Sequence, residues 1–82
     1  MARLVYKVYV QFKDDTPQEE AASFSIEGDY DSDEVLGTNY LRDHMADFGF
    51  KKQDGFVYFG SAIVDADNYK SMKVVLDSKY KD

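Results

Sequence analysis

The chain has 82 residues, no cysteine and a formal net charge of −6 at neutral pH. This length predicts one domain over residues 1–82, and the lack of cysteine excludes disulfide bonds and cysteine-ligated zinc. A single histidine, His44, leaves little room for a histidine metal site or a catalytic triad. No apolar run reaches the roughly 18 residues that span a membrane, and the N-terminus lacks a signal-peptide pattern. We therefore expect a soluble cytoplasmic protein.

The acidic residues are concentrated in one part of the chain. Residues 14–34 carry nine carboxylates and no lysine or arginine, whereas residues 1–13 have a net charge of +3. Such a block repels a phosphate backbone, so we expect no direct nucleic-acid binding through it. The candidate binding surface for a protein partner consists of Glu27, Asp29, Asp31, Asp33 and Glu34.

Two strands are predicted at the start of the chain. Residues 4–13 alternate between apolar and mixed side chains, which is typical of a strand with one buried face. Residues 14–21 include the only proline, Pro17, and predict a turn. The alternation resumes over residues 22–27, so we expect a second strand that pairs with the first as a hairpin.

A helix is predicted over residues 33–48, where apolar side chains recur every three or four positions. Ser32 is the expected N-cap, because its hydroxyl can accept from the first free amides of the helix. Gly37 lowers the helix propensity by about 1 kcal/mol relative to alanine. Gly49 is the expected stop. We expect His44, beside the apolar face, to be a structural or surface residue.

Asp54-Gly55 is a preferred pair for a tight turn, so residues 50–53 and 56–64 predict a second hairpin. Residues 56–59 are apolar on both faces, which favours a central strand. Gly60 indicates a bulge or a close backbone approach. The final segment is ambiguous, since it fits both the period of a strand and that of a helix. We favour a helix over residues 67–80.

The predicted order is β-β-α-β-β-α, with the last element either helix or strand. This order indicates an α+β class: a ferredoxin-like antiparallel sheet with one or two helices packed on one face. The arrangement leaves an open sheet edge, which proteins usually cover or pair. Residues 22–27 can fill that edge, or a second subunit can.

Residues 39–80 contain a second source of information. Leu41-Arg42, Gly49-Phe50 and Gly55, followed by Val57-Tyr58, resemble the helix-stop and hairpin signature of the VapD family, which is related to the Cas2 nucleases. The resemblance implies a ferredoxin-like fold, a homodimer and endoribonuclease activity.

The resemblance also directs attention to the end of the first strand. The VapD family places an aspartate within or just after that strand, where this chain has Gln11 or Lys13. Asp14 and Asp15 come one or two positions later and are the candidate catalytic residues under this interpretation. A shift of one residue turns a strand side chain to the opposite face. The departure therefore weakens the nuclease hypothesis.

Two metal sites are conceivable from the acidic residues. Asp29, Asp31 and Asp33 match the first three ligands of a calcium loop, but the loop glycine and the closing glutamate are replaced by Glu34 and Tyr40. We therefore expect no calcium site. Asp14 or Asp15 can gather with Asp29 or Asp31 at one end of a sheet and hold Mg²⁺ for phosphodiester cleavage. Turn chemistry explains these aspartates more simply, and we expect no metal site.

The sequence predicts a small acidic interaction protein that forms a homodimer and acts by binding another protein. An inhibitor, an antitoxin-like protein or a regulator from a phage or mobile element fits, with carboxylates placed where phosphates would lie. This function needs no metal and no other cofactor, and we favour it over an enzyme. The alternative is a VapD-like, metal-dependent endoribonuclease with a degenerate active site, for which Mg²⁺ is the expected cofactor.

Overall fold

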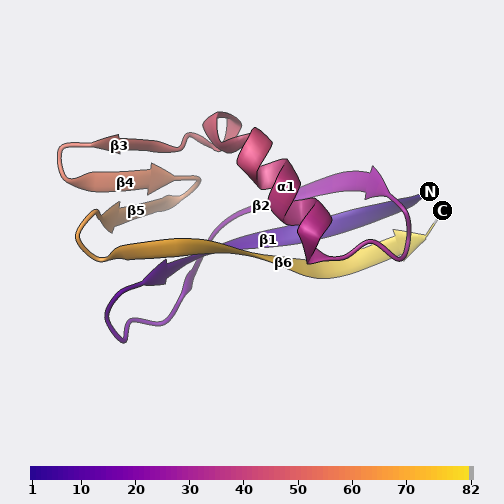
Figure 1. Ribbon diagram of the computed structural model, residues 1–82, viewed down its shortest axis with the longest axis horizontal. Helices are drawn as coiled ribbons and strands as arrows, with labels where there is room; N and C mark the ends of the chain where they lie inside the picture. The colour runs from indigo at the N-terminus through magenta and orange to yellow at the C-terminus, as the bar shows by residue number, and fades with distance from the viewer. Residues whose placement is uncertain (82) are drawn as a thin grey trace.

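Figure 1 shows the computed structural model, which describes residues 1–81. Two three-stranded antiparallel sheets and one α-helix make up the fold. Sheet A has the order β2-β1-β6 and contains β1 (Ala2–Phe12), β2 (Glu19–Gly28) and β6 (Tyr69–Lys81). Sheet B has the order β3-β4-β5 and contains β3 (Lys51–Gln53), β4 (Phe56–Phe59) and β5 (Ala62–Asp65). Along the chain, β2 is followed by α1 (Glu34–Asp43) and a 3₁₀ turn, η1 (Met45–Phe48), which lead into β3.

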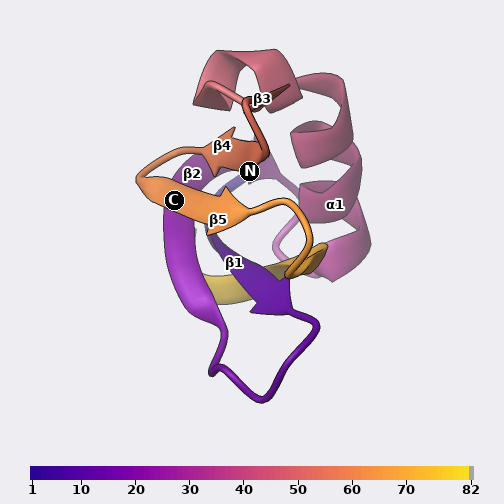
Figure 2. The same ribbon diagram turned by 90° about the vertical axis from the view of Figure 1, so that its left-hand side faces the viewer.

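The first strand is the centre of the molecule. β1 is paired along its length with β2 on one side and β6 on the other. Its alternating apolar side chains Leu4, Tyr6, Val8 and Val10 are at most 1% exposed. Leu41 of α1 and three residues of sheet B belong to the same buried cluster as this row, so both elements cover it: Phe59, Ala62 and Val64. Figure 2 shows α1 and sheet B arranged around β1. The predicted strand over residues 4–13 and its hairpin with residues 22–27 are confirmed.

The predicted α+β, ferredoxin-like arrangement is wrong, and the reason lies in the last segment. Residues 69–81 form strand β6 and pair with β1 from Phe12↔Tyr69 to Ala2↔Lys81, so the helix expected over residues 67–80 is absent. β6 hydrogen-bonds the side of β1 that β2 leaves free, which satisfies backbone groups that a helix would leave unpaired. β3, β4 and β5 form their own sheet instead of extending sheet A.

The predicted helix over residues 33–48 is divided in two. α1 ends at Asp43, and η1 continues to Gly49, whose φ of 76° is the left-handed stop that the sequence indicated. The N-cap is Asp33, one residue after the expected Ser32, and its carboxylate accepts from the Val35 amide at 3.0 Å. At the other end, His44 Nδ1 donates to the Tyr40 carbonyl oxygen at 2.8 Å. His44 is thus a structural residue.

Tyr6 joins α1 to sheet A. Its hydroxyl donates to the Asp33 carbonyl oxygen at 2.8 Å, and its ring lies directly against the backbone of Gly37. The ring also stacks on Phe24 of β2, with a centroid distance of 5.4 Å, and Phe24 in turn stacks on Tyr40. The glycine that weakens the helix locally is therefore a position where the helix lies directly against a side chain of the sheet.

Sheet B is attached to sheet A through Gly60. The turn at Asp54-Gly55 has positive φ at both residues, 54° and 81°, and confirms the predicted turn between two paired strands. The single strand expected over residues 56–64 is wrong, because the chain turns back at Gly60 and Ser61 and forms two antiparallel strands, β4 and β5. Gly60 has a φ of 56° and its Cα faces the carbonyl group of Ala21. Its amide donates to Phe48, and the next amide, of Ser61, donates to Ala21 at 3.0 Å. The close approach predicted at Gly60 is confirmed.

Replacing Tyr6 with phenylalanine tests this contact through pH. Burial raises the pKa of Tyr6 above its ordinary value of 10.0, and the carboxylates of Asp33 and Glu34 raise it further. Folding thus favours the neutral phenol. The stability that this preference provides is complete below pH 10.0 and is lost as pH rises through the raised pKa. We expect Tyr6→Phe to lower the unfolding free energy near pH 7 by about 1 kcal/mol through the lost hydrogen bond.

The diagnostic result is a smaller fall in stability above pH 10.0 for Tyr6→Phe than for the unmodified chain. Urea unfolding at about pH 7 and about pH 11 measures both quantities. Tyr30→Phe, at an exposed tyrosine, is the matched control for the removal of one phenol hydroxyl. Equal pH dependence in Tyr6→Phe and the unmodified chain would contradict the role given to Tyr6.

Candidate functional site

The aspartates considered for a shared metal site lie at opposite ends of sheet A. Asp14 and Asp15 are in the loop between β1 and β2, whereas Asp29 and Asp31 follow β2 at its far end. A strand the length of β1 separates the two groups by about 30 Å, so the structure does not bring these aspartates together as a shared magnesium site would require. Within residues 1–81, no three histidine, aspartate or glutamate side chains come together in a way that could hold a metal ion.

Asp14 acts as a turn residue. Its carboxylate accepts from the Thr16 amide at 2.9 Å and from Asn68 Nδ2 at 3.0 Å, and its own amide donates to Asn68 Oδ1. The hydrogen bonds from Thr16 lower the pKa of Asp14, with a smaller contribution from Asn68. The residue thus connects the β1–β2 loop to the β5–β6 loop. Asp15, the second catalytic candidate, is exposed.

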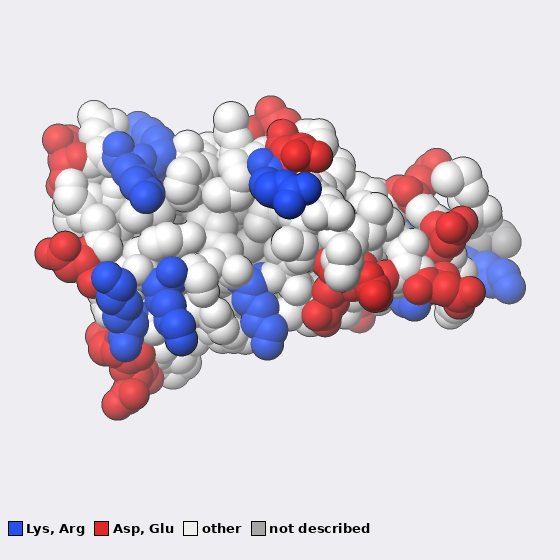
Figure 3. Space-filling view, in the orientation of Figure 1, with Lys and Arg blue, Asp and Glu red and all other residues white. Residues whose placement is uncertain are grey.

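The acidic segment, residues 27–34, lies at the end of the molecule that also holds both chain termini (Figure 1). In Figure 3 that end shows a group of acidic side chains, further acidic side chains lie at the opposite end, and most of the lysines and arginines visible lie away from the acidic segment. All five predicted binding residues are exposed: Glu27, Asp29, Asp31, Asp33 and Glu34.

No salt bridge engages these five carboxylates within the described part of the chain. The salt bridges there join Lys7 to Glu20 and Asp77, and Arg42 to Asp43. Two lysines nevertheless border the acidic segment, because the Nζ atoms of Lys79 and Lys81 lie 5.4 and 5.7 Å from the centre of the Tyr30 ring. The acidic surface is therefore limited in extent on the side of β6.

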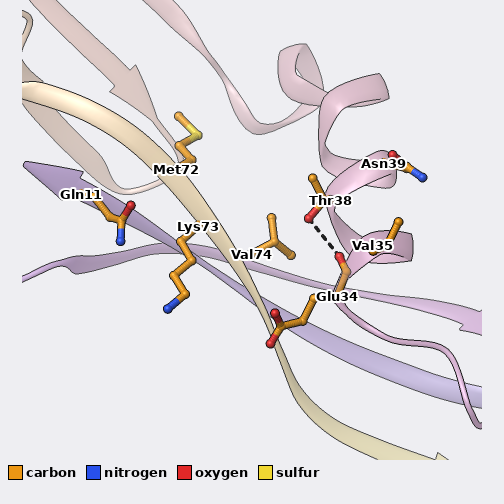
Figure 4. Close-up of a pocket in the computed structure, with 8 residues that line it drawn as sticks. All are labelled: Gln11, Glu34, Val35, Thr38, Asn39, Met72, Lys73 and Val74. Atoms are coloured by element: carbon orange, nitrogen blue, oxygen red, sulfur yellow. Dashed lines mark hydrogen bonds between the residues drawn. The ribbon is translucent and has the colours of Figure 1, made fainter.

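A groove runs between α1 and β6, and we call it the α1–β6 groove. It is formed by three adjoining hollows, whose apolar lining comprises Val35, Leu41, Met45, Met72, Val74 and Leu76. Figure 4 shows its middle part: Met72 and Val74 project toward the helix, whereas Lys73 points away to the other face of the sheet. Asp33 and Glu34 lie at the end where α1 begins. The sequence analysis missed this groove because it assigned Met72, Val74 and Leu76 to a helix.

The outer edge of β6 borders this groove. β6 is the last strand of sheet A and pairs with β1 alone. Among residues 1–81, no backbone hydrogen bond outside the regular pairing of sheet A involves residues 69–81. A long edge of free amide and carbonyl groups is a surface to which a further strand can add. The sequence predicted an open edge but placed it on a different sheet.

Comparison with known proteins found no family model, no curated protein and no solved structure that matches this chain. The resemblance of residues 39–80 to the VapD family therefore stays a prediction. The described residues contain no helix of the length and apolar character needed to cross a bilayer.

Proposed function

We propose that this chain is a homodimeric cytoplasmic protein that acts by binding another protein, and that the acidic segment is the surface that binds it. The observation that carries this proposal is the set of five exposed carboxylates at one end of the molecule, free of salt bridges throughout the described residues. Unpaired surface carboxylates are available to lysines and arginines of a partner, and they accelerate encounter with a basic surface.

The class of partner follows from this chemistry. A basic surface that recognises carboxylates in a row is typical of proteins that bind nucleic-acid phosphates, since lysine and arginine neutralise both. The chain would occupy such a surface and exclude nucleic acid from it. An inhibitor, an antitoxin-like protein or a regulator of phage or mobile-element origin would act in this way.

The hydrogen bonds of Asp14 favour binding over the ribonuclease alternative. A metal-dependent nuclease needs carboxylates that converge on one ion. Asp14 instead holds Thr16 and Asn68, and the other acidic candidates lie a strand length away. The position of Asp14 is thus accounted for by turn structure.

The test compares two variants of equal charge as baits for proteins from the source cells. The first replaces carboxylates of the acidic segment, Glu27→Gln with Asp29→Asn and Asp31→Asn, and leaves Asp33 in place because it caps α1. The second makes Asp43→Asn, Asp47→Asn and Asp54→Asn elsewhere on the surface. Each variant removes three carboxylates from a chain of net charge −6 and so has net charge −3.

We expect the unmodified chain and the second variant to capture the same basic protein, and the first variant to lose it. Capture should also decline steeply between ~0.05 M and ~0.5 M NaCl, because salt screens exposed charges. Equal capture by both variants would contradict the assignment of the acidic segment. Mg²⁺-dependent RNA cleavage that Asp14→Asn or Asp15→Asn abolishes would instead establish the ribonuclease alternative.

A further inference from the structure

We infer that the α1–β6 groove and the free edge of β6 together bind an extended segment of a partner protein, which adds to sheet A as a further strand. On the face toward α1, this segment carries a cation, an apolar group and an anion at successive alternate positions. The inference goes beyond the proposed function, because it concerns a different surface that meets the acidic segment only at the end where α1 begins.

The regular part of β6 supplies the backbone groups for this pairing. Residues 71–76 pair with β1 without interruption, whereas the register shifts on either side of them. Sheet A ends at β6, and no described residue pairs with its outer edge. Every second residue of this stretch therefore turns a free amide and carbonyl group outward, and an added strand satisfies them. Bulges twist an edge away from further pairing, so the two irregularities confine the added strand to about six residues.

The groove supplies an apolar floor beside that edge. Met72, Val74 and Leu76 alternate along the regular stretch and share the face toward α1, as Figure 4 shows for the first two. Met72 and Leu76 are only half-buried, and Val35, at the rim on α1, is 64% exposed. In a strand paired with β6, side chains on the same face lie beside these residues. An apolar side chain at the middle of the segment therefore removes exposed apolar surface of the groove from water.

The charges at the two ends of the groove determine what the segment carries there. Where α1 begins, the lining has three carboxylates and one lysine: Asp31, Asp33, Glu34 and Lys79. Where α1 ends, Arg42 is the charged residue among the described residues that line the groove. Arg42 lies 3.9 Å from Asp43, but both side chains are exposed and the pair is therefore weak. A complementary segment has a lysine or arginine beside the start of α1 and a carboxylate beside Arg42.

The direction and spacing of these groups follow from the fold. All pairs in sheet A are antiparallel, and a strand antiparallel to β6 starts beside Leu76 and ends beside Met72. α1 runs the same way, since its first residues share a hollow with Leu76 and Arg42 shares one with Met72. Glu34 and Arg42 are about 12 Å apart along the helix, which corresponds to about four residues of a strand. From its N-terminus, the segment therefore reads cation, any residue, apolar, any residue, anion.

An NMR titration of the full chain with a synthetic peptide tests this inference. The peptide has lysine, valine and glutamate at alternate positions, with threonine between them and at both blocked ends. The control peptide exchanges the lysine and the glutamate, so its composition is the same. We expect the first peptide to shift the amides of residues 71–76 and Val35 with a Kd of about 1 mM or below. The control should bind about fivefold more weakly, and equal binding of the two peptides would overturn the inference.

Two methylated peptides determine whether the backbone of the segment pairs with β6. Adjacent residues of a strand turn their amides to opposite sides, so only alternate amides of the peptide face β6. We expect that methylating the valine amide in one peptide, and the neighbouring threonine amide in another, abolishes binding of one and leaves the other nearly unchanged. Equal losses in both, or no loss in either, would show that the peptide does not add to β6 as a strand.

Variants of the chain locate the binding in the groove. Val35→Ser should weaken binding of the first peptide about fivefold, because it removes an apolar contact at the rim. Glu34→Gln should weaken it about two- to fivefold through the lost ion pair. Ile63→Ser is the matched control, since Ile63 is 66% exposed but lies on sheet B, and it should leave binding unchanged. Equal losses from Val35→Ser and Ile63→Ser would contradict binding in the groove. Circular dichroism verifies that each variant keeps its strand content.

Peptide binding and capture of a basic protein are separate measurements, so this inference and the proposed function can fail independently. Capture through the acidic segment without peptide binding overturns this inference and leaves the proposed function in place. Peptide binding that depends on Val35 and on one set of alternate amides supports the inference, even where the acidic segment captures no protein.

Discussion

Gly60→Ala is expected to lower the free energy of unfolding by about 3–5 kcal/mol. Two effects add at this position. A φ of 56° is left-handed, and a side chain there costs about 1–2 kcal/mol. In addition, a Cβ on Gly60 would overlap the carbonyl oxygen of Ala21, which is backbone and cannot turn aside. Because the overlapped atom belongs to the backbone, the cost lies in the upper part of the range for overpacking, at about 2–3 kcal/mol.

The consequence is large relative to the whole stability of the protein. Stabilities of about 0.05–0.15 kcal/mol per residue imply about 4–12 kcal/mol for 82 residues. Gly55→Ala is the matched control, because Gly55 also has positive φ but a Cβ added there would have no other atom within 4 Å. Denaturant titration should show a loss of about 1–2 kcal/mol for Gly55→Ala. Similar losses in both variants would contradict the contact between Gly60 and Ala21.

Gly37→Ala is expected to destabilise the protein by about 1–2 kcal/mol although alanine is the better helix former. Alanine gains about 1 kcal/mol of helix propensity over glycine. A Cβ on Gly37, however, would overlap three ring atoms of Tyr6, so the cost lies in the upper part of the range for overpacking, at about 2–3 kcal/mol. Tyr6 is completely buried and its hydroxyl is held by Asp33, so the ring has no free direction in which to move.

The control for Gly37→Ala is Asn39→Ala, an exposed position of the same helix. It should raise stability by a few tenths of a kcal/mol through propensity alone. Thermal or urea unfolding of the two variants gives opposite signs if α1 lies against Tyr6 as described. A gain in stability from Gly37→Ala would mean that the helix does not approach the sheet at this glycine.

Local signals predicted the first two thirds of the fold well. The alternation over residues 4–13 defined a buried face that the structure retains in β1, and the hairpin with β2 followed from the turn between them. Asp54-Gly55 and Gly49 occupy the left-handed conformations that their residue types favour. In each case the information lies within a few neighbouring residues, which is why a sequence reveals it.

The final segment shows where local reasoning stops. Residues 69–81 carry apolar spacings that satisfy both a strand and a helix, so their own pattern does not decide between the two. The decision comes from β1, more than 50 positions earlier, which has a free side for pairing. Tertiary pairing of this kind overrides weak propensity. Because this one strand was assigned to a helix, the predicted fold class was α+β, whereas the structure is mostly β.

The sequence identified the residues of the acidic segment, but not the residues from distant strands that surround them. The acidic segment is exposed, as its polar residues indicated, yet the proximity of Lys79 and Lys81 to Tyr30 depends on β6 running back to the chain start. The α1–β6 groove likewise exists only because residues 69–81 form a strand. The structural role of Asp14 depends on its hydrogen bond with Asn68, a residue 54 positions away in the chain. No spacing pattern in the sequence identifies such a distant partner.

The central claim is that residues 69–81 form an edge strand of sheet A, because both the fold class and the α1–β6 groove depend on it. Proton–proton contacts measured by NMR test this claim most directly. We expect contacts between the backbones of Val8 and Val74 and of Tyr6 and Leu76, which are strand partners here. Contacts between successive amide protons through residues 67–80, without those cross-strand contacts, would show a helix and contradict the account.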